Sequence, residues 1–210
     1  MTEDRVVLFI DYQNCYRATR AVFYDHDTAS SFLGQINPLA LGQLLVERSD
    51  RPRKLKQVRV YRGLPSQQRD PKGYAATRRQ IAAWEGDDRV KVIQRPLQYP
   101  EGWPVTSLPG EKPKEKGVDV ALAVDFATMA AKKEYDVGAI FSLDTDLKPA
   151  LEYVAELTRA WGKPRAEVMA WAIPGHRKSR LAIGGANLFC HWLGEQDRRL
   201  VEDLTRYSDD

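Results

Sequence analysis

The sequence is poor in the residues that several classes of protein require. Its two cysteines, Cys15 and Cys190, are too few for a disulfide framework and lack the spacing of metal ligands. No apolar run approaches the roughly 18 residues that span a membrane, and no glycine-rich phosphate loop is present. Residues 1–4 carry no basic or apolar signal segment. These absences favour a soluble protein of a reducing, cytoplasmic compartment, without membrane contact or a nucleotide cofactor.

The composition is that of an ordinary globular domain with a slightly basic surface. Of the 210 residues, 43% are hydrophobic and 29% are charged, which predicts a single α/β domain over residues 1–210. The net charge of +3, with an isoelectric point near 8.8, permits a polyanionic partner but does not require one.

Apolar runs alternate with segments of helical character along the chain. Strands are predicted at residues 5–10, 58–61, 90–93, 137–143 and 168–173. Helices are predicted at 13–23, 38–47 (with Asn37 as N-cap), 71–84, 118–129, 147–161, 179–193 (interrupted at Gly184-Gly185) and 195–205. The alternation predicts an α/β fold of three layers, with helices on both faces of a central parallel sheet of about five strands.

A loop at residues 96–113 interrupts this alternation. It holds five prolines and two glycines in 18 residues. A loop of that length inside a compact domain is often functional or disordered. We expect it to be a long proline-rich loop within the single domain.

Acidic residues follow two of the predicted strands. Asp11 ends the first strand, Asp144 and Asp146 follow the fourth, and Asp119 lies near the start of the helix at 118–129. Because ligands of open parallel sheets bind beyond the carboxyl ends of the strands, we expect these side chains to meet in space. A carboxylate cluster without histidine or cysteine suits Mg²⁺ or Mn²⁺, which offsets the repulsion between the acids and activates water.

Each acidic residue also has a purely structural interpretation. An aspartate at a strand end often forms a turn or caps a helix, which applies to Asp11, Asp144 and Asp146. Asp119 interacts favourably with the dipole of its helix. The joint arrangement nevertheless favours function, because three separate segments are expected to converge on one edge of the sheet. Asp125 lies about 240° around the helix from Asp119, so we expect it to pair with a cation instead.

Polar and basic residues near the acids are candidates for substrate binding. Asn14 suits contact with a phosphate or a metal-held water, and equally a cap of the first helical turn. Glu115 is either a ligand or a solvated loop charge, and Lys116 is either a phosphate-binding cation or part of a solvated charge run. Two basic groups are expected at the edge that carries the acids and are favoured as phosphate binders: Arg17 with Arg20, and Arg177 with Lys178 and Arg180.

Two further sets of residues are less informative. The basic stretch at 51–56 precedes a strand, so it is expected at the opposite edge of the sheet. Tyr12, Tyr16 and Tyr24 suit base stacking, although aromatic residues at helical spacing more often belong to the core.

Three segments carry a resemblance to a known family. Residues 9–14 (FIDYQN), 116–125 (KGVDVALAVD) and 142–149 (SLDTDLKP) resemble, in the same order, the motifs of the NYN domain family, a branch of the PIN-like nucleases. The resemblance covers roughly residues 5–190 and implies a PIN-like fold and divalent-metal-dependent cleavage of RNA. It implies that the acidic site consists of Asp11, Asp119, Asp144 and Asp146. Asn187 is a departure, since similar proteins often carry an aspartate there.

The resulting prediction is a metal-dependent endoribonuclease that hydrolyses RNA phosphodiesters with a metal-activated water. The first alternative is a non-catalytic RNA-binding or scaffold protein that keeps the fold and the acidic pocket. The second is a phosphatase with an aspartyl nucleophile in Asp144-Thr145-Asp146, which is disfavoured because the pair follows the fourth strand and is followed by Leu147. Homodimerisation and regulation by a protein partner stay open.

Overall fold

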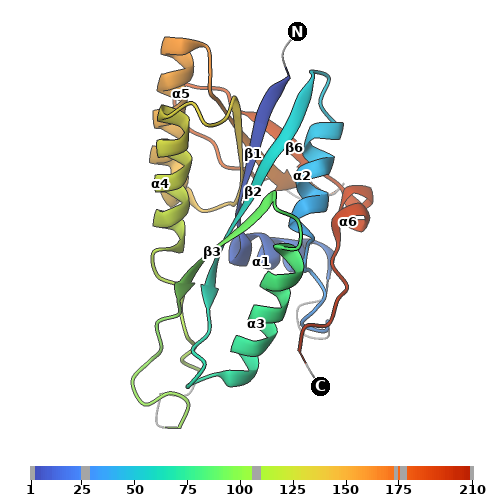
Figure 1. Cartoon of the computed structure of the whole chain (residues 1–210), viewed down its shortest axis with the longest axis vertical. Coiled ribbons are helices and arrows are strands. Elements are labelled where there is room, and N and C mark those ends of the chain that lie inside the picture. Colours follow the sequence, from blue (N-terminus) through green and yellow to red (C-terminus); the bar gives the residue numbers. More distant parts are fainter. Residues whose placement is uncertain (1–2, 25–28, 106–109, 173–174, 176–178, 209–210) are drawn as a thin grey trace.

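The structure is a three-layer α/β arrangement around a six-stranded, all-parallel sheet (Figure 1). It is a computed structural model that describes residues 3–24, 29–105, 110–172, 175 and 179–208. In chain order the elements are β1 (Asp4–Asp11), α1 (Tyr12–Phe23), α2 (Pro38–Glu47), β2 (Arg53–Leu64), α3 (Pro71–Trp84), β3 (Val90–Pro96), α4 (Val118–Ala131), β4 (Val137–Phe141), the short 3-10 helix η1 (Thr145–Leu147), α5 (Lys148–Trp161), β5 (Arg165–Trp171), β6 (Phe189–Leu193) and α6 (Glu195–Val201).

The strand order places the first strand near the middle of the sheet. Neighbouring strands follow the order β3-β2-β1-β4-β5-β6. The chain therefore builds outward from β1 to β3 on one side, and then returns to add β4, β5 and β6 on the other. The order reverses between β1 and β4, whose ends pair at Ile10 and Phe141. Such a reversal leaves a crevice at the carboxyl ends of the two strands, which is where open α/β sheets bind ligands.

The sheet has one strand more than the sequence pattern predicted. The segment 179–193 was expected to be a helix, but its last five residues form β6, which pairs with β5. A short apolar run does not distinguish a strand from a buried helical segment, and Gly184 and Gly185 disfavour a continuous helix. These residues form a strand because they pair with the edge of β5 that would otherwise be free. Several boundaries also differ: β2 and β3 are longer than predicted, β4 ends at Phe141 rather than at Leu143, β5 runs from Arg165 to Trp171, and α6 ends at Val201 rather than at Thr205.

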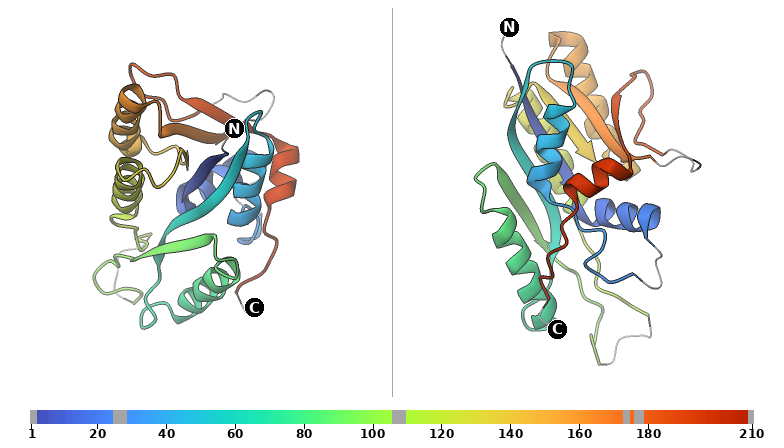
Figure 2. Two further views of the ribbon diagram at one scale, coloured as in Figure 1. Left: turned by 45° about the horizontal axis from the view of Figure 1, so that its top comes forward. Right: turned by 90° about the vertical axis from the view of Figure 1, so that its right-hand side faces the viewer.

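Two hydrophobic cores cover the two faces of the sheet. Side chains of β1 alternate between them: Leu8 and Ile10 pack with α1, α2, α3 and α6, whereas Val7 and Phe9 pack with α4 and α5. Figure 2 shows the same division of the helices. The ring of Phe9 makes an edge contact with Phe126 at 5.1 Å between centroids. Each fully buried side chain of this size contributes about 1.5–3 kcal/mol, so β1 is a firmly held strand and the residue at its end has a fixed position.

The start of α2 provides a test of the local structure. The Asn37 side chain accepts a hydrogen bond from the backbone N–H of Ala40 at 3.0 Å, as predicted for an N-cap. Asn37→Ala removes this acceptor and is expected to lower the free energy of unfolding by about 1 kcal/mol. For a chain of this size the melting temperature falls by roughly 2–4 °C. Thermal unfolding followed by circular dichroism measures the change. Asn37→Asp keeps the acceptor and is the matched control, so an equal loss in both variants would contradict the assignment.

Within the described ranges, no helix is both long enough and apolar enough to cross a membrane.

Candidate active site

Three aspartates bring their carboxylates together beyond the carboxyl end of β4. One oxygen each of Asp119, Asp144 and Asp146 lies within 4.8 Å of the other two. Asp119 comes from the first turn of α4, and the other two come from η1 and its N-cap. Asp144 and Asp119 are partly buried and Asp146 is exposed. Segments about 25 residues apart in sequence thus converge on one point, as the position of these acids at the sheet edge predicts.

The donor set fits a hard divalent cation. All three donors are carboxylate oxygens, which Mg²⁺ and Mn²⁺ prefer over nitrogen or sulfur. Two ligands of one Mg²⁺ ion, each about 2.1 Å from it, lie at most about 4.2 Å apart. Oxygens already within 4.8 Å of one another need only small side-chain rotations to reach that geometry.

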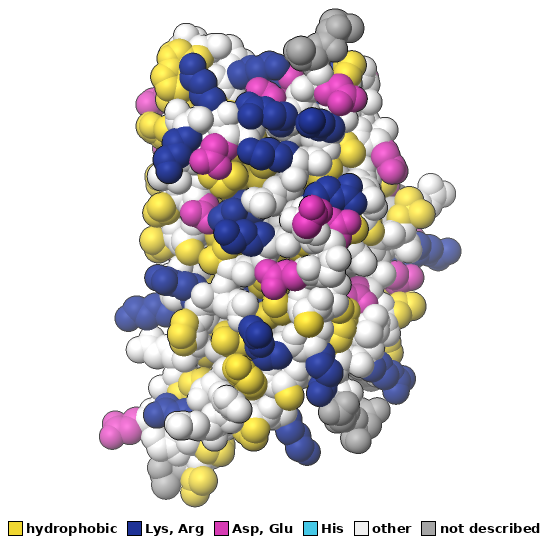
Figure 3. Space-filling model, viewed as in Figure 1, with side chains coloured by type: hydrophobic (Ala, Val, Ile, Leu, Met, Phe, Trp, Pro, Cys, Tyr) yellow, Lys and Arg dark blue, Asp and Glu magenta, His cyan; other side chains and the backbone are white. Residues whose placement is uncertain are grey.

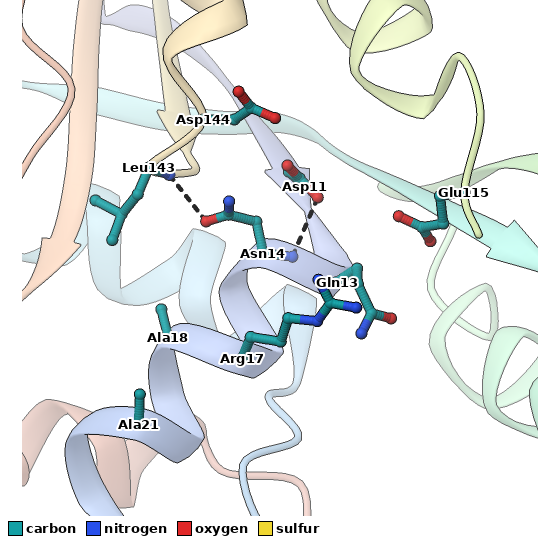
Figure 4. A pocket seen from close by; sticks show the side chains of 9 residues that line it. All are labelled: Asp11, Gln13, Asn14, Arg17, Ala18, Ala21, Glu115, Leu143 and Asp144. Carbon is teal, nitrogen blue, oxygen red and sulfur yellow. Dashed lines mark hydrogen bonds between the residues drawn. The ribbon is translucent and has the colours of Figure 1, made fainter. Parts of the chain in front are cut away.

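Asp11 lies beside this group of three and is more deeply buried than its members. The side chain ends β1 and caps α1, accepting the backbone N–H of Asn14 at 3.2 Å and the hydroxyl of Ser142 at 3.0 Å. Burial raises the pKa of Asp11 to about 6; the two hydrogen bonds oppose the shift, and the charges of Glu115 and Asp144 add to it. Figure 4 shows the Asp11 and Asp144 carboxylates next to each other in the same pocket. A cation bound in this pocket would relieve their repulsion.

Ser142 and Asn14 hold the acidic loop against β1 and α1. The Ser142 hydroxyl donates to Asp11 and accepts the backbone N–H of Asp144, both at 3.0 Å. The Asn14 side-chain oxygen accepts the backbone N–H of Leu143 at 2.9 Å (Figure 4). These bonds join segments about 130 residues apart. Sequence reasoning missed the role of Ser142, whose only signal was its place two residues before Asp144.

The hydrogen bond of Asn14 leads to a prediction for metal binding. Asn14→Ala leaves the N–H of Leu143 without its acceptor and frees the loop that carries Asp144. Loss of such a supporting contact typically lowers metal affinity or activity about 10- to 100-fold. Titration calorimetry with Mn²⁺ measures the affinity, and a circular dichroism melt checks that the fold persists. Asn37→Ala, which also removes one side-chain acceptor at a helix start, is the control. Unchanged Mn²⁺ affinity in Asn14→Ala would show that Asn14 only caps α1.

The pocket next to the acidic group has a volume of about 380 Å³. Its lining includes Asp11, Asn14, Arg17, Glu115 and Asp144. Glu115 is therefore not a solvated loop charge: it is partly buried, and it accepts the backbone N–H of Gly63 at 2.5 Å. Burial raises its pKa, against the opposing effects of that hydrogen bond and of the nearby arginines. A side chain at position 63 would collide with Glu115, since a Cβ there would meet its Cγ at 2.9 Å.

The predicted phosphate-binding cations divide into three groups. Arg17 lines the pocket and is exposed, and Lys116 is exposed just before α4. Arg20 is a correction, because it is buried and its guanidinium donates to the carbonyls of residues 29, 30 and 33. Its donors are thus directed at the segment that follows α1 and not at a substrate. Arg177 and Lys178 lie outside the described residues and stay a prediction from the sequence.

Basic residues also gather at the other end of the sheet. Figure 3 shows them over the upper part of the view, where the strands begin. The stretch 51–56 lies there, at the edge opposite the acidic pocket, as predicted. Within it, Arg53 is not solvated but pairs with the buried Glu167 at 2.7 Å. Glu167 also lies 2.7 Å from His191, so buried charged groups hold this end of the sheet, away from the acids.

The remaining candidates have structural partners. Asp125 pairs with Arg59 at 2.5 Å, which confirms the prediction that it pairs with a cation. Tyr12 is buried and its hydroxyl accepts a hydrogen bond from Gln80 at 3.0 Å, so it belongs to the core. Asn187 lines a separate pocket beside β6.

The sheet is doubly wound and parallel, and acidic residues lie where its strand order reverses. The protein is therefore an α/β protein with an acidic candidate active site. The chain belongs to the NYN domain family, whose model matches residues 5–162 and which is a branch of the PIN-like nucleases. The family predicted from the three sequence motifs is therefore confirmed, and the matched stretch contains all four aspartates. Among solved structures, a protein of unknown function from Vibrio parahaemolyticus RIMD 2210633 is 16% identical, with a TM-score of 0.46 over 82% of this chain and 83% of the other. No curated protein matches the chain.

Proposed function

We propose that the protein is a divalent-metal-dependent endoribonuclease that hydrolyses RNA phosphodiester bonds. The observation that carries this proposal is the convergence of the Asp119, Asp144 and Asp146 carboxylates within 4.8 Å in a chain of the NYN family. Such an all-oxygen group suits Mg²⁺ or Mn²⁺ and no redox or nucleotide cofactor.

Different residues of the site bind the cation and the phosphodiester. Asp119, Asp144 and Asp146 hold the ion, with Asp11 beside them as the fourth acidic catalytic residue. When bound, the ion supplies a Lewis acid that lowers the pKa of water and offsets charge developing on the phosphoryl group. Asn14 and Ser142 keep the loop of Asp144 in place. Arg17 and Lys116 attract the polyanionic substrate. The sequence predicts the same role for Arg177 and Lys178.

The same fold also suits a protein that binds RNA without cleaving it. The full set of carboxylates disfavours this alternative, because clustered acids repel both one another and the phosphates of RNA unless a cation joins them. A binding protein would gain affinity by losing them. Regulation by a partner protein, dimerisation and cytoplasmic location are compatible with either function.

The deciding experiment is a cleavage assay with purified protein. Labelled single-stranded and duplex RNAs of mixed sequence are incubated with Mn²⁺ or Mg²⁺, and in parallel with a chelator. We expect metal-dependent internal cleavage that is lost in the Asp11→Asn/Asp144→Asn double variant. Asp88→Asn, an exposed aspartate before β3 at the opposite edge of the sheet, is the matched control and keeps full activity.

The outcomes separate the two functions. Cleavage that needs metal and the acidic residues establishes the nuclease. RNA binding without cleavage, under conditions where calorimetry detects Mn²⁺ binding, favours the non-catalytic alternative. Cleavage that survives the double variant would come from a contaminant and would remove the support for the proposal.

A further inference from the structure

An arginine that the sequence pattern did not single out lies beside the acidic centre. Arg95 belongs to the end of β3, where it pairs with Gly63 of β2. Its guanidinium reaches across to Gly117, the residue that precedes α4. A methyl group built on Gly117 would lie 3.4 Å from Nη2 and 3.8 Å from Nε of Arg95. Gly117 is two residues before Asp119, so this cation lies against the segment that leads into the acidic group.

The backbone around Gly117 permits this placement. Gly117 has a positive φ of 71°, a conformation that glycine adopts without strain. Its missing side chain also leaves the space over which the guanidinium of Arg95 lies. The contact therefore joins the end of β3 to the start of the helix that supplies Asp119.

Arg95 is not engaged by the acids around it. Across the part of the chain that the structure describes, the Arg95 side chain makes no hydrogen bond or ion pair, although Asp119 and Glu115 lie on neighbouring segments, and it is exposed. A planar guanidinium with free donors matches the geometry of a phosphate, to which it binds through two parallel hydrogen bonds.

Neither the helix dipole nor a helix cap accounts for this position. A cation over the start of a helix meets the positive end of the helix dipole, which disfavours the folded state by a small amount. Nor can Arg95 cap α4, because a guanidinium carries only donors and cannot accept the free N–H groups at the start of a helix. The arrangement is more favourable with an anion on the guanidinium than without one.

Arg17 provides a second exposed cation on the other side of the pocket. It projects from α1 among the pocket-lining residues, and its charge lowers the pKa of Glu115. Figure 4 shows Glu115 on the side of Asp11 away from Leu143, and Arg17 on α1 below Asp11. Arg17 of α1 thus lines the acidic pocket, and Arg95 of β3 lies against the start of the helix that supplies Asp119.

We propose that Arg95 is a substrate-binding residue that holds a backbone phosphate of single-stranded RNA, so that the strand runs from α1 at Arg17 across the acidic centre to the end of β3. This assignment rests on the RNA-cleaving function proposed above. It adds a phosphate contact on the α4 side of the centre, where the sequence had suggested only Lys116.

The test compares Arg95→Gln with a distant arginine. Arg51→Gln, an exposed arginine at the opposite edge of the sheet, is the matched control. Binding of a fluorescent 12-nucleotide oligouridylate is measured by anisotropy at several salt concentrations in Ca²⁺, a cation that carboxylate oxygens also hold, so that the acids do not repel the strand. We expect Arg95→Gln to weaken binding about 3- to 10-fold at low salt. The slope of log K against log salt should fall by about 0.7, the contribution of one phosphate contact to a single strand.

A conservative variant and a kinetic readout distinguish binding from structure. Arg95→Lys keeps the charge and therefore the slope, but loses the two-pronged contact and recovers only part of the affinity. In the cleavage assay, Arg95→Gln raises KM with little change in kcat, which is the signature of lost uniform binding. The melting temperature stays that of the unsubstituted protein.

Each result has a separate meaning for the two proposals. Equal affinity and slope in Arg95→Gln and the unsubstituted protein would overturn the assignment of Arg95, while metal-dependent cleavage would still stand. An Arg95-dependent slope without any cleavage would support Arg95 as an RNA contact and remove the nuclease. Failure of the unsubstituted protein to bind the oligouridylate would overturn the Arg95 proposal.

Discussion

Asp144→Asn is expected to lower the rate of RNA cleavage by about a thousandfold. Asp144 is the residue that belongs both to the group of three carboxylates and to the pocket that contains Asp11. A bound cation contributes several kcal/mol to stabilisation of the transition state, and a loss of about 4 kcal/mol corresponds to roughly three orders of magnitude in rate. The rate constant under single-turnover conditions measures the effect, with Asp88→Asn as control.

The same substitution should leave the fold intact. The asparagine side chain in this variant keeps an oxygen that can accept the N–H of residue 146, as Asp144 does at 3.0 Å. Removing one of several close negative charges relieves repulsion in the metal-free protein. We therefore expect an equal or slightly higher melting temperature in a chelator, together with weaker Mn²⁺ binding. Near-normal turnover in this variant would argue against the acidic centre as the site of catalysis, and a large loss of stability would make its kinetics uninformative.

Asp11→Asn is expected to lower the rate of RNA cleavage and, without metal, to raise the stability of the fold. We expect cleavage to fall by about a hundredfold or more, since an acid next to the metal group contributes less than a direct ligand but still carries an essential charge. In a chelator at pH 7, however, the variant should be more stable than the unsubstituted protein. The reason is that the pKa of Asp11 in the folded protein is raised to about 6.

The sign follows from proton binding. A raised pKa means that the folded state holds the proton more tightly than the unfolded state, so stability declines as the pH rises from about 4 to about 6 and is level above that. The difference between the raised pKa and the ordinary value of an aspartate corresponds to at most about 3 kcal/mol. The asparagine oxygen accepts a weaker hydrogen bond from Ser142 than the carboxylate of Asp11 does. This reduces the expected gain in the free energy of unfolding to about 1–2 kcal/mol.

Urea unfolding of both proteins in a chelator at pH 4, 5, 6 and 7 measures this difference. The stability advantage of Asp11→Asn should be largest at pH 7 and should shrink toward pH 4, where Asp11 of the unsubstituted protein is protonated. An advantage that does not vary with pH would mean that burial does not raise the pKa of Asp11. Serving as a control, Asp88→Asn should show no such dependence, since Asp88 is exposed.

Much of the local structure could be predicted because its causes are local. The apolar run before Asp11 forms β1, Asn37 caps α2, and Asp144 caps η1. The residue types at the strand ends also indicated the chemistry, because a group of carboxylates without histidine or cysteine suits few ions besides Mg²⁺ and Mn²⁺. The motifs around these acids predicted the NYN family.

Other features depend on contacts between distant segments. β6 forms because β5 offers a free edge, which a periodicity in the sequence does not reveal. The sequence pattern grouped Arg20 with Arg17. The place of each arginine around α1 decides that Arg20 faces backbone carbonyls such as that of Ser30, whereas Arg17 faces the pocket. Glu115 faces the pocket because Gly63 of another strand supplies an N–H to it.

The sequence by itself thus determined the alternation of strands and helices, the four aspartates and the kind of ion that they suit. Periodicity and residue chemistry are properties of short segments, so they can be read along the chain. Only the tertiary structure decided that Asp119, Asp144 and Asp146 share one centre, that Asp11 lies buried beside them, and that Arg95 of β3 lies against Gly117 at the start of α4. These relations depend on the strand order and on the path of the backbone between the strands, which residues far apart in the sequence determine together.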